Sequence, residues 1–264
     1  MKEYRDQMNC TIRLAETPSR IVSLVPSQTQ LLHDLGLEEE VIAITKFCIH
    51  PKIWFDSKER IGGTKSVDIE KVRRLKPDLI IGNKEENSKE DIAALQEIAP
   101  VWMSDIYSLR DALEMIHSIG ELINRETKSL IDSIQDEFQM LHDYSAEQSS
   151  KKKSVLYFIW DDPKMVAGKD TFVDEMLSQC GLENATSYSR YPMIDSTELS
   201  PDYVFLSSEP FPFKEKHLAL FQEQYPQAKI RLVDGEMFSW YGSKLKDAPS
   251  YFKVILTSLD DLIL

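Results

Sequence analysis

One local pattern occurs twice in this chain, once in each half. The stretch "KPDLIIGNKE" begins at Lys76, and "SPDYVFLSSE" begins at Ser200. Each reads Pro-Asp, four mostly apolar residues, two small or polar residues, and then Glu. A proline followed by a short, β-rich apolar run marks the start of a buried strand. The repeat therefore predicts two similar lobes, each with a strand that ends in the same kind of polar loop.

The surrounding sequence alternates strand patterns with helix patterns. "RIVSLV", "VIAIT" and "DLIIG" have the composition of strands in the first half, and "VLYFIW", "DYVFL" and "IRLV" have it in the second. Ser27 with Gln30 three positions later matches a capping box, and Asp68, Ser88 and Thr171 are further capping residues. Strands that alternate with helices indicate mostly parallel sheets. The predicted fold is α/β, with two similar lobes.

The segment from Ser108 to Tyr144 interrupts this alternation. It contains no proline and one glycine, Gly120, and its apolar residues recur at spacings of three, four and seven. This spacing is typical of an amphipathic helix. At 1.5 Å per residue, such a helix would be about 50 Å long. We expect one long backbone helix over residues 108–146, which joins an N-terminal lobe (1–107) to a C-terminal lobe (147–264).

Composition excludes several classes of partner. The formal net charge of −13 argues against a nucleic-acid partner, which would need a basic surface. No apolar run reaches the roughly 20 residues of a membrane-spanning helix. The three cysteines lack paired spacing. The first residues have no apolar core of a signal peptide, so the sequence as it stands predicts a reduced, cytoplasmic protein, and a monomer is expected.

Ligands of open α/β sheets bind beyond the carboxyl ends of the strands. The residues that follow each predicted strand therefore define a candidate inter-lobe cleft, which mixes aromatic with polar groups as a ligand pocket requires. The candidate ligand-binding residues are Ser27, Phe47, Lys65, Trp160, Glu209, Phe211, Trp240 and Tyr241.

No enzyme motif accompanies these residues. Gly-x-Gly-x-x-Gly, Gly-x-Ser-x-Gly and His-Glu-x-x-His are all absent, so no catalytic residue is assigned. His50 is the one candidate metal ligand, because a strand would place it on the same face as Cys48. An ordinary loop after a strand explains the same two residues.

Several stretches together resemble a known family. These are "RIVSLVPSQTQLLHDLGL", "ERIGGTKSVDIEKVRRLKPDLIIG", "WDDPKMVAGKDTF", "SSEPFPFKEKH" and "VDGEMFSWYG". In this order they resemble the substrate-binding proteins of ABC importers for cobalamin, siderophores and haem, and most of all the cobalamin-binding branch. The resemblance covers the chain from about Thr11 to its end. It implies two Rossmann-like α/β lobes joined by a single long backbone helix. It also implies a protein without an intrinsic cofactor that holds a metal complex (cobalamin-like, haem or ferric siderophore) between these lobes.

The resemblance also implies a partner and a location. Glu70 and Glu198 correspond to the surface glutamates with which these proteins dock to the ABC permease, and Thr64 and Asn83 occupy positions where cobalamin-binding relatives carry tryptophans. Such proteins work in the periplasm or cell envelope, which would require a leader ahead of this sequence. The alternative is a cytoplasmic metal- or tetrapyrrole-handling protein, or a chelatase-like enzyme, on a related two-lobed fold.

Overall fold

The structure is a computed structural model that describes residues 1–148, 152–195 and 199–260. The chain divides into two compact units. The N-terminal unit comprises Met1–Ile106, Arg110–Asp132 and Tyr241–Lys244, and the C-terminal unit comprises Tyr107–Leu109, Ser133–Trp240 and Leu245–Leu264. Each unit is built on its own five-stranded sheet, so the predicted α/β class with parallel sheets is confirmed.

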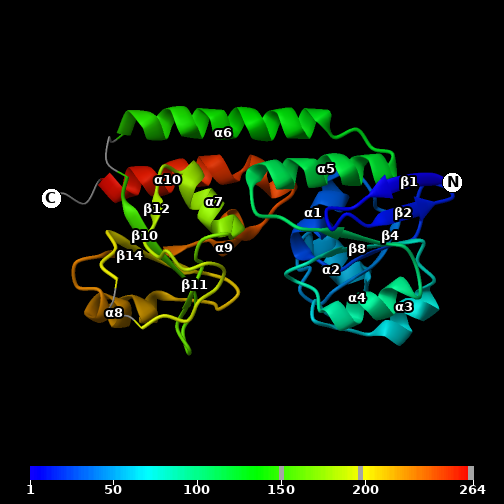
Figure 1. Cartoon of the computed structure of the whole chain (residues 1–264), viewed down its shortest axis with the longest axis horizontal. Coiled ribbons are helices and arrows are strands. Elements are labelled where there is room, and N and C mark those ends of the chain that lie inside the picture. Colours follow the sequence, from blue (N-terminus) through cyan, green and yellow to red (C-terminus); the bar gives the residue numbers. More distant parts are fainter. Residues whose placement is uncertain (149–151, 196–198, 261–264) are drawn as a thin grey trace. The chain divides into compact units, whose positions relative to one another are not determined.

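The sheet of the N-terminal unit has the strand order β5-β4-β3-β8-β9. All of its neighbouring strands run parallel. The strands are β3 (Ile21–Ser23), β4 (Val41–Ile44), β5 (Glu59–Arg60), β8 (Leu79–Asn83) and β9 (Val101–Ser104). The helices are α1 (Pro26–Asp34), α2 (Lys52–Ser57), α3 (Ile69–Leu75), α4 (Lys89–Gln96) and α5 (Leu109–Ile123). Figure 1 shows α1 and α5 on one side of this sheet and α3 and α4 on the other.

Two short antiparallel hairpins complete the N-terminal unit. One pairs β1 (Lys2–Arg5) with β2 (Thr11–Leu14). The other pairs β6 (Gly62–Gly63) with β7 (Ser66–Val67) and leads into α3.

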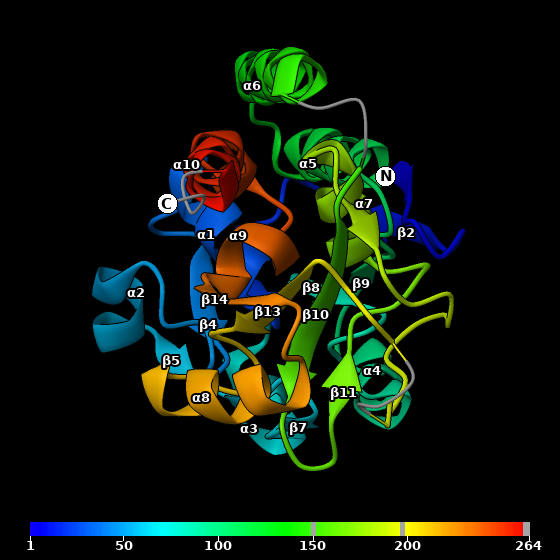
Figure 2. The ribbon, with the colours of Figure 1, turned by 90° about the vertical axis from the view of Figure 1, so that its left-hand side faces the viewer.

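The sheet of the C-terminal unit has the order β11-β10-β13-β14, with β12 paired to β10. Its central strands are parallel, and β11 alone pairs in the antiparallel direction. The strands are β10 (Ser154–Trp160), β11 (Met165–Val166), β12 (Glu183–Asn184), β13 (Tyr203–Ser207) and β14 (Lys229–Val233). The helices are α7 (Phe172–Gln179), α8 (Glu215–Gln224), α9 (Gly235–Ser239) and α10 (Ala248–Asp260), with a 3-10 turn at Ser243–Lys246. Figure 2 shows β10, β13 and β14 side by side.

Alternation along the central strands builds two cores in the C-terminal unit. Successive side chains of a strand point to opposite faces of the sheet. Phe158 packs against Phe221 of α8 at a centroid distance of 4.8 Å. On the opposite face, Tyr157 lies 5.2 Å from Phe238 of α9, and Phe238 in turn packs on α10. Helices on both faces explain why these strands are apolar throughout.

The repeated Pro-Asp pattern has the same structural role in both units. The Asp78 carboxylate, which precedes β8, accepts hydrogen bonds from the backbone N–H groups of Ser19 and Arg20, just before β3. The Asp202 carboxylate, which precedes β13, accepts from the backbone N–H and hydroxyl of Ser154, at the start of β10. In each unit, the aspartate therefore fixes the amino ends of two neighbouring parallel strands.

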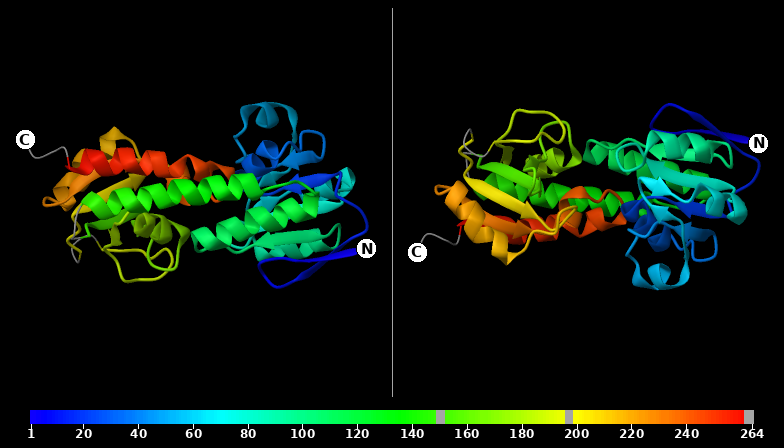
Figure 3. Two further views of the ribbon diagram at one scale, coloured as in Figure 1. Left: turned by 90° about the horizontal axis from the view of Figure 1, so that it is seen from above. Right: turned by 90° about the horizontal axis from the view of Figure 1, so that it is seen from below.

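The prediction of one continuous helix from Ser108 to Tyr144 is wrong. The segment forms two helices, α5 and α6 (Lys128–Gln148), which Figure 3 shows as separate coils. Asn124 takes a left-handed conformation (φ 53°), and the Arg125 N–H bonds to the Gly120 carbonyl at 2.9 Å. This is a Schellman-type helix end. Gly120 is needed there, because an added Cβ would lie 2.9 Å from the Arg125 carbonyl oxygen.

Candidate ligand-binding edges

Each sheet has a point at which its strand order reverses. The N-terminal sheet grows outward from β3 through β4 to β5 and then resumes on the other side of β3 with β8. The C-terminal sheet has β12 on one side of β10 and β13 on the other. Ligands of open α/β sheets bind beyond the carboxyl ends of the strands at such switch points. The loops after β3 and β8, and those after β10 and β13, are therefore the candidate site of each unit.

An aromatic pair occupies the switch point of the C-terminal unit. Trp160, the last residue of β10, meets Phe211 edge-on at a centroid distance of 5.6 Å. The Phe211 N–H bonds to the Ile159 carbonyl, and its ring also packs against Phe213 at 4.7 Å. Trp160 remains 40% exposed. The pair is an accessible apolar surface that is supported from behind by packed rings.

Glu209 lies beside this pair in the loop after β13. One carboxylate oxygen, Oε1, accepts the Ser239 hydroxyl at 2.6 Å and the Trp240 indole N–H at 3.0 Å. Burial raises the pKa of Glu209, and the nearby Glu236 and Asp234 carboxylates raise it further, while the hydrogen bonds from Ser239 and Trp240 act in the opposite direction. Glu209 is thus a partly buried carboxylate in an acidic setting.

Trp240 is the donor in that arrangement and is only 6% exposed. The structure therefore brings Trp240 and Glu209 together as predicted, but as a hydrogen-bonded pair within one unit. A buried indole whose N–H is already bonded offers little surface to a ligand. Trp160 and Phe211 are the aromatic residues of this edge with accessible faces.

Ser27 lies at the switch point of the N-terminal unit, where α1 begins. The predicted capping box is wrong, because the helix starts at Pro26 and the N-cap Val25 has no side-chain cap. Ser27 is instead inside the first turn and 4% exposed, and its hydroxyl oxygen has no hydrogen-bond partner among the residues that the structure describes. Proline at the first helical position replaces the capping signal, since it lacks an N–H that would need a partner.

Tyr241 and Gly242 pack against this same edge of the N-terminal unit. The Tyr241 hydroxyl donates to Glu86, in the loop after β8, at 3.0 Å. Gly242 lies so close to the start of α1 that an added Cβ would be 3.0 Å from the Ser27 carbonyl oxygen. Tyr241 is 6% exposed, so it seals part of the predicted site.

Phe47 and Lys65 lie on neighbouring turns of the N-terminal unit. Phe47 follows β4 and is 51% exposed, with the Lys46 ammonium 5.1 Å from the centre of its ring. Lys65 is exposed in the turn between β6 and β7. Gly63 of β6 lets the Phe47 ring approach, because an added Cβ there would be 3.2 Å from it. This part of the edge therefore presents the exposed Phe47 ring, with the positively charged Lys46 beside it.

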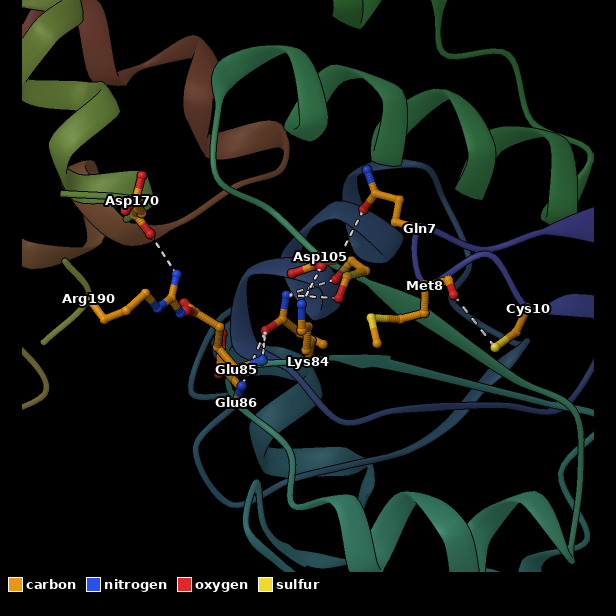
Figure 4. Close-up of polar contacts among 11 residues, drawn as sticks. Gln7, Met8, Cys10, Lys84, Glu85, Glu86, Asp105, Asp170 and Arg190 are labelled. Atoms are coloured by element: carbon orange, nitrogen blue, oxygen red, sulfur yellow. Dashed lines mark hydrogen bonds and ion pairs between the residues drawn. The ribbon is translucent and has the colours of Figure 1, made fainter.

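A polar network supports the loops after β8 and β9. Lys84 pairs with Asp105 at 2.7 Å, and the Asp105 N–H donates to Gln7 (Figure 4). The buried Asn83 side chain donates to the Ser104 hydroxyl at 3.0 Å and accepts the backbone N–H of Glu85 at 2.8 Å. Asn83 therefore fixes the backbone of this edge.

The Cys48 side chain points into the core of the N-terminal unit. Its thiol is fully buried and bonds with Thr29 at 3.1 Å and Thr45 at 3.2 Å. Burial raises the pKa of Cys48 to about 11, which disfavours the thiolate that binds metals. β4 ends at Ile44, so Cys48 and His50 lie in the following turn and share no strand face. Within the described part of the chain, no group of three potential metal ligands occurs.

The structure describes one of the two predicted docking glutamates. Glu70 is exposed in the first turn of α3, where it forms a 3.4 Å ion pair with Arg73. Glu198 lies outside the described residues.

Three features of these edges were not predicted from the sequence. Ser239 fixes Glu209, Glu86 binds Tyr241, and Gly235 gives Glu209 its room, since an added Cβ there would be 2.6 Å from the Glu209 Cγ. Of these residues, only Gly235 could have been noticed in the sequence, because it is a glycine that follows a strand and a helix-capping aspartate directly.

Relatives of the chain include two informative proteins. One is an uncharacterized ABC transporter substrate-binding lipoprotein, YvrC, of Bacillus subtilis, 30% identical over 190 residues. That alignment covers 69% of this chain and 60% of YvrC, so the chain matches about three fifths of that relative's length. A vitamin B12-binding protein of Pectobacterium carotovorum is 24% identical over 261 residues, which cover 95% of this chain and 92% of the relative.

A solved structure shares the fold. The periplasmic haem-binding protein RhuT from Roseiflexus superposes with a TM-score of 0.78 at 20% identity, over 91% of this chain and 98% of RhuT. In the described part of this chain, no helix has the length and apolar character needed to cross a membrane.

The family model for periplasmic binding proteins matches residues 21–223, which contain the central strands of both sheets and both switch points. The sequence resemblance and the expected class, a binding protein rather than an enzyme, agree with this match. The chain belongs to the periplasmic binding protein family.

Proposed function

We propose that this protein is the substrate-binding component of an ABC importer, and that its ligand is a metal complex such as cobalamin, haem or a ferric siderophore. The family match over both sheets carries this proposal. The relatives named above include an ABC transporter lipoprotein and a vitamin B12-binding protein, and RhuT binds haem. These names support a bulky metal complex as the ligand class.

The accessible aromatic surfaces support the same class of ligand. Phe47 after β4, and Trp160 with Phe211 at the β10–β13 switch point, present ring faces at the carboxyl edges of the two sheets. A large planar or macrocyclic complex gains much of its binding free energy from contact with such rings. In this proposal the ligand contacts such exposed rings, and the protein itself needs no catalytic group and no resident cofactor.

Delivery to a permease and action outside the cytoplasmic membrane belong to the same proposal. They rest on the lipoprotein and periplasmic descriptions of the relatives. Glu70 supports the docking role, because it is exposed and weakly paired. An exposed carboxylate adds little stability, but it can orient and accelerate association with a basic partner.

The ligand assignment can be tested by titration with cyanocobalamin, haemin and a ferric catecholate, followed by absorption and tryptophan fluorescence. We expect one of these complexes to bind, and Trp160→Ala to weaken that binding about tenfold without lowering the melting temperature. Leu220→Ala, at an exposed apolar position on α8, is the control. If the wild-type protein binds none of the three, the assignment is wrong.

A test of the docking assignment requires a transport assay with the permease. With the cognate permease in vesicles, Glu70→Lys should reduce stimulated transport and leave ligand affinity unchanged. Glu90→Lys, in the first turn of α4 of the same unit, reverses a comparable exposed charge and should have no effect. Equal transport by the two variants would exclude Glu70 from docking.

A further inference from the structure

The two oxygens of the Glu209 carboxylate have different environments. Oε1 accepts both the Ser239 hydroxyl and the Trp240 indole N–H. The neighbouring backbone is fixed as well, because the Ser207 hydroxyl donates to the Glu209 carbonyl at 2.6 Å and Gly235 packs against the Glu209 Cγ. The side chain is therefore held from one oxygen. Oε2 has no partner in the described ranges and is not a sealed buried atom.

No cation balances this carboxylate among the residues that the structure describes. The charged groups that act on it are Glu236 and Asp234, both negative. The ammonium group of Lys164, which follows the neighbouring strand β10, is already paired with Asp161 at 3.1 Å. A partly buried carboxylate normally has a cation or several donors as partners. The open oxygen thus lacks the donor that such a group requires.

We infer that Glu209 determines ligand specificity, with Oε2 accepting N–H donors from a metal complex whose rim carries carboxamides rather than carboxylates. The inference rests on the proposed function and narrows its ligand class. A carboxamide N–H placed at Oε2 gains a charge-assisted hydrogen bond. A ligand carboxylate in the same place would face three negative groups, so such a ligand is disfavoured by repulsion and by its unpaired acceptor.

The Glu209→Gln variant tests whether Oε2 acts as the acceptor, with little disturbance of the fold. The Ser239 and Trp240 donors require an oxygen at the Oε1 position, so the new amide must place its NH₂ group where Oε2 was. The variant keeps the contacts that hold Trp240 and converts the open acceptor into a donor. Glu236→Gln, a neutralisation on the neighbouring helix α9, is the matched control for charge alone.

The probes are cyanocobalamin, which has carboxamides around its ring; haemin, whose ring edge has two carboxylates; and a ferric catecholate. The wild-type protein should bind cyanocobalamin most tightly. Glu209→Gln should weaken cyanocobalamin binding about tenfold or more and should strengthen haemin binding. Glu236→Gln removes a nearby charge but not the acceptor, so it should change cyanocobalamin binding by less than about threefold and strengthen haemin binding less than Glu209→Gln does. The indole fluorescence of the Glu209→Gln protein without ligand should match the wild type, which shows that the clamp on Trp240 is intact.

The outcomes separate this inference from the proposed function. Tighter wild-type binding of haemin or of the ferric catecholate would overturn the inference and leave the transport role standing. Unchanged cyanocobalamin affinity in Glu209→Gln, with intact fluorescence, would reduce Glu209 to a residue that positions Trp240. Absence of binding to all three complexes would reject both proposals.

Discussion

Gly235→Ala tests whether the loop around Glu209 is as tightly packed as the structure indicates. An added Cβ would lie 2.4 Å from the Ser207 hydroxyl oxygen, 2.6 Å from the Glu209 Cγ and 3.1 Å from the Glu209 backbone nitrogen. Real Cβ contacts are not this short, so at least one neighbour must move. The substitution places one methyl group at the base of the proposed specificity residue.

Neither close neighbour can move without losing a hydrogen bond. Ser207 is buried, and its hydroxyl donates to the Glu209 carbonyl at 2.6 Å and accepts the Tyr157 hydroxyl at 3.1 Å. Glu209 is held by Ser239 at 2.6 Å. Overpacking of this kind costs roughly 1–3 kcal/mol. For a domain of this size, each kcal/mol lowers the melting temperature by about 2–4 °C, so we expect a loss of roughly 2–12 °C.

Thermal unfolding followed by tryptophan fluorescence measures this loss. Gly63→Ala is the matched control, because its closest contacts would be the hydroxyl of exposed Ser66 at 2.9 Å and the ring of half-exposed Phe47 at 3.2 Å, and both side chains can shift into solvent. That variant should melt within about 2 °C of the wild type. A Gly235→Ala protein that melts within the same margin would refute the packing argument. So would strict additivity with Ser207→Ala, since removal of the crowded hydroxyl should relieve part of the cost.

Three further predictions concern the helix break, the buried acid and the thiols. Asn124→Ala should lower the free energy of unfolding by about 1 kcal/mol in denaturant titrations and Asn124→Gly should not, because the left-handed conformation at this position penalises a Cβ; equal effects would contradict the assigned turn. The raised pKa of Glu209 means that the folded state holds its proton more tightly than the unfolded chain does. Wild-type stability should therefore fall as pH rises from the ordinary glutamate pKa through the raised one. Glu209→Gln should thus melt higher than wild type at pH 7–8, with the advantage disappearing near pH 4, and a constant difference would count against the shift. Burial raises the pKa of Cys48 to about 11 and that of Cys180 well above its ordinary value, whereas Cys10 is exposed; a thiol reagent at pH 8 should label Cys10 alone until denaturant is added, and rapid native labelling of a second thiol would contradict the burial.

Local signals predicted the beginnings of several helices correctly. Asp68 accepts the Lys71 N–H at 2.9 Å, and Ser88 and Thr171 each accept the N–H three residues ahead. These caps depend on neighbours within one turn, so the sequence contains all the information that they need. The alternation of strands and helices was likewise sufficient for the α/β class, because each central strand is covered on both faces and must be apolar throughout.

The break between α5 and α6 shows where periodicity fails as a guide. Ile123 and Leu130 are seven residues apart, a spacing that also fits an unbroken helix. The turn between them uses Asn124 in place of glycine at the left-handed position, and Gly120 makes room for Arg125. Asn is a weaker signal than Gly or Pro, and a lone glycine inside a helical pattern is often only tolerated.

The site residues were harder to predict, because their roles depend on distant partners. Position after a strand selected both Trp160 and Phe211, which the structure shows in contact, since parallel strands bring their carboxyl ends to one edge. It also selected Tyr241, which is largely buried and bonded to a glutamate 155 positions away. No local pattern can report such a contact, so burial at a sheet edge requires the structure.

The repeated Pro-Asp pattern fixes the amino edge of each sheet and leaves the carboxyl edge, where a ligand would bind, free to vary. Asp78 and Asp202 fix the amino ends of their strand pairs with equivalent hydrogen bonds, so the register of β3 with β8 and of β10 with β13 is set at that edge. The carboxyl edges are then free to differ. The glutamates that follow at the same offset illustrate this freedom: the loop of Glu85 is held by Asn83 through its backbone, whereas Glu209 is held through one carboxylate oxygen, with the other left open. A duplicated framework can therefore keep its stability determinants at one edge while ligand specificity changes at the other, and the search for the ligand should begin at Glu209.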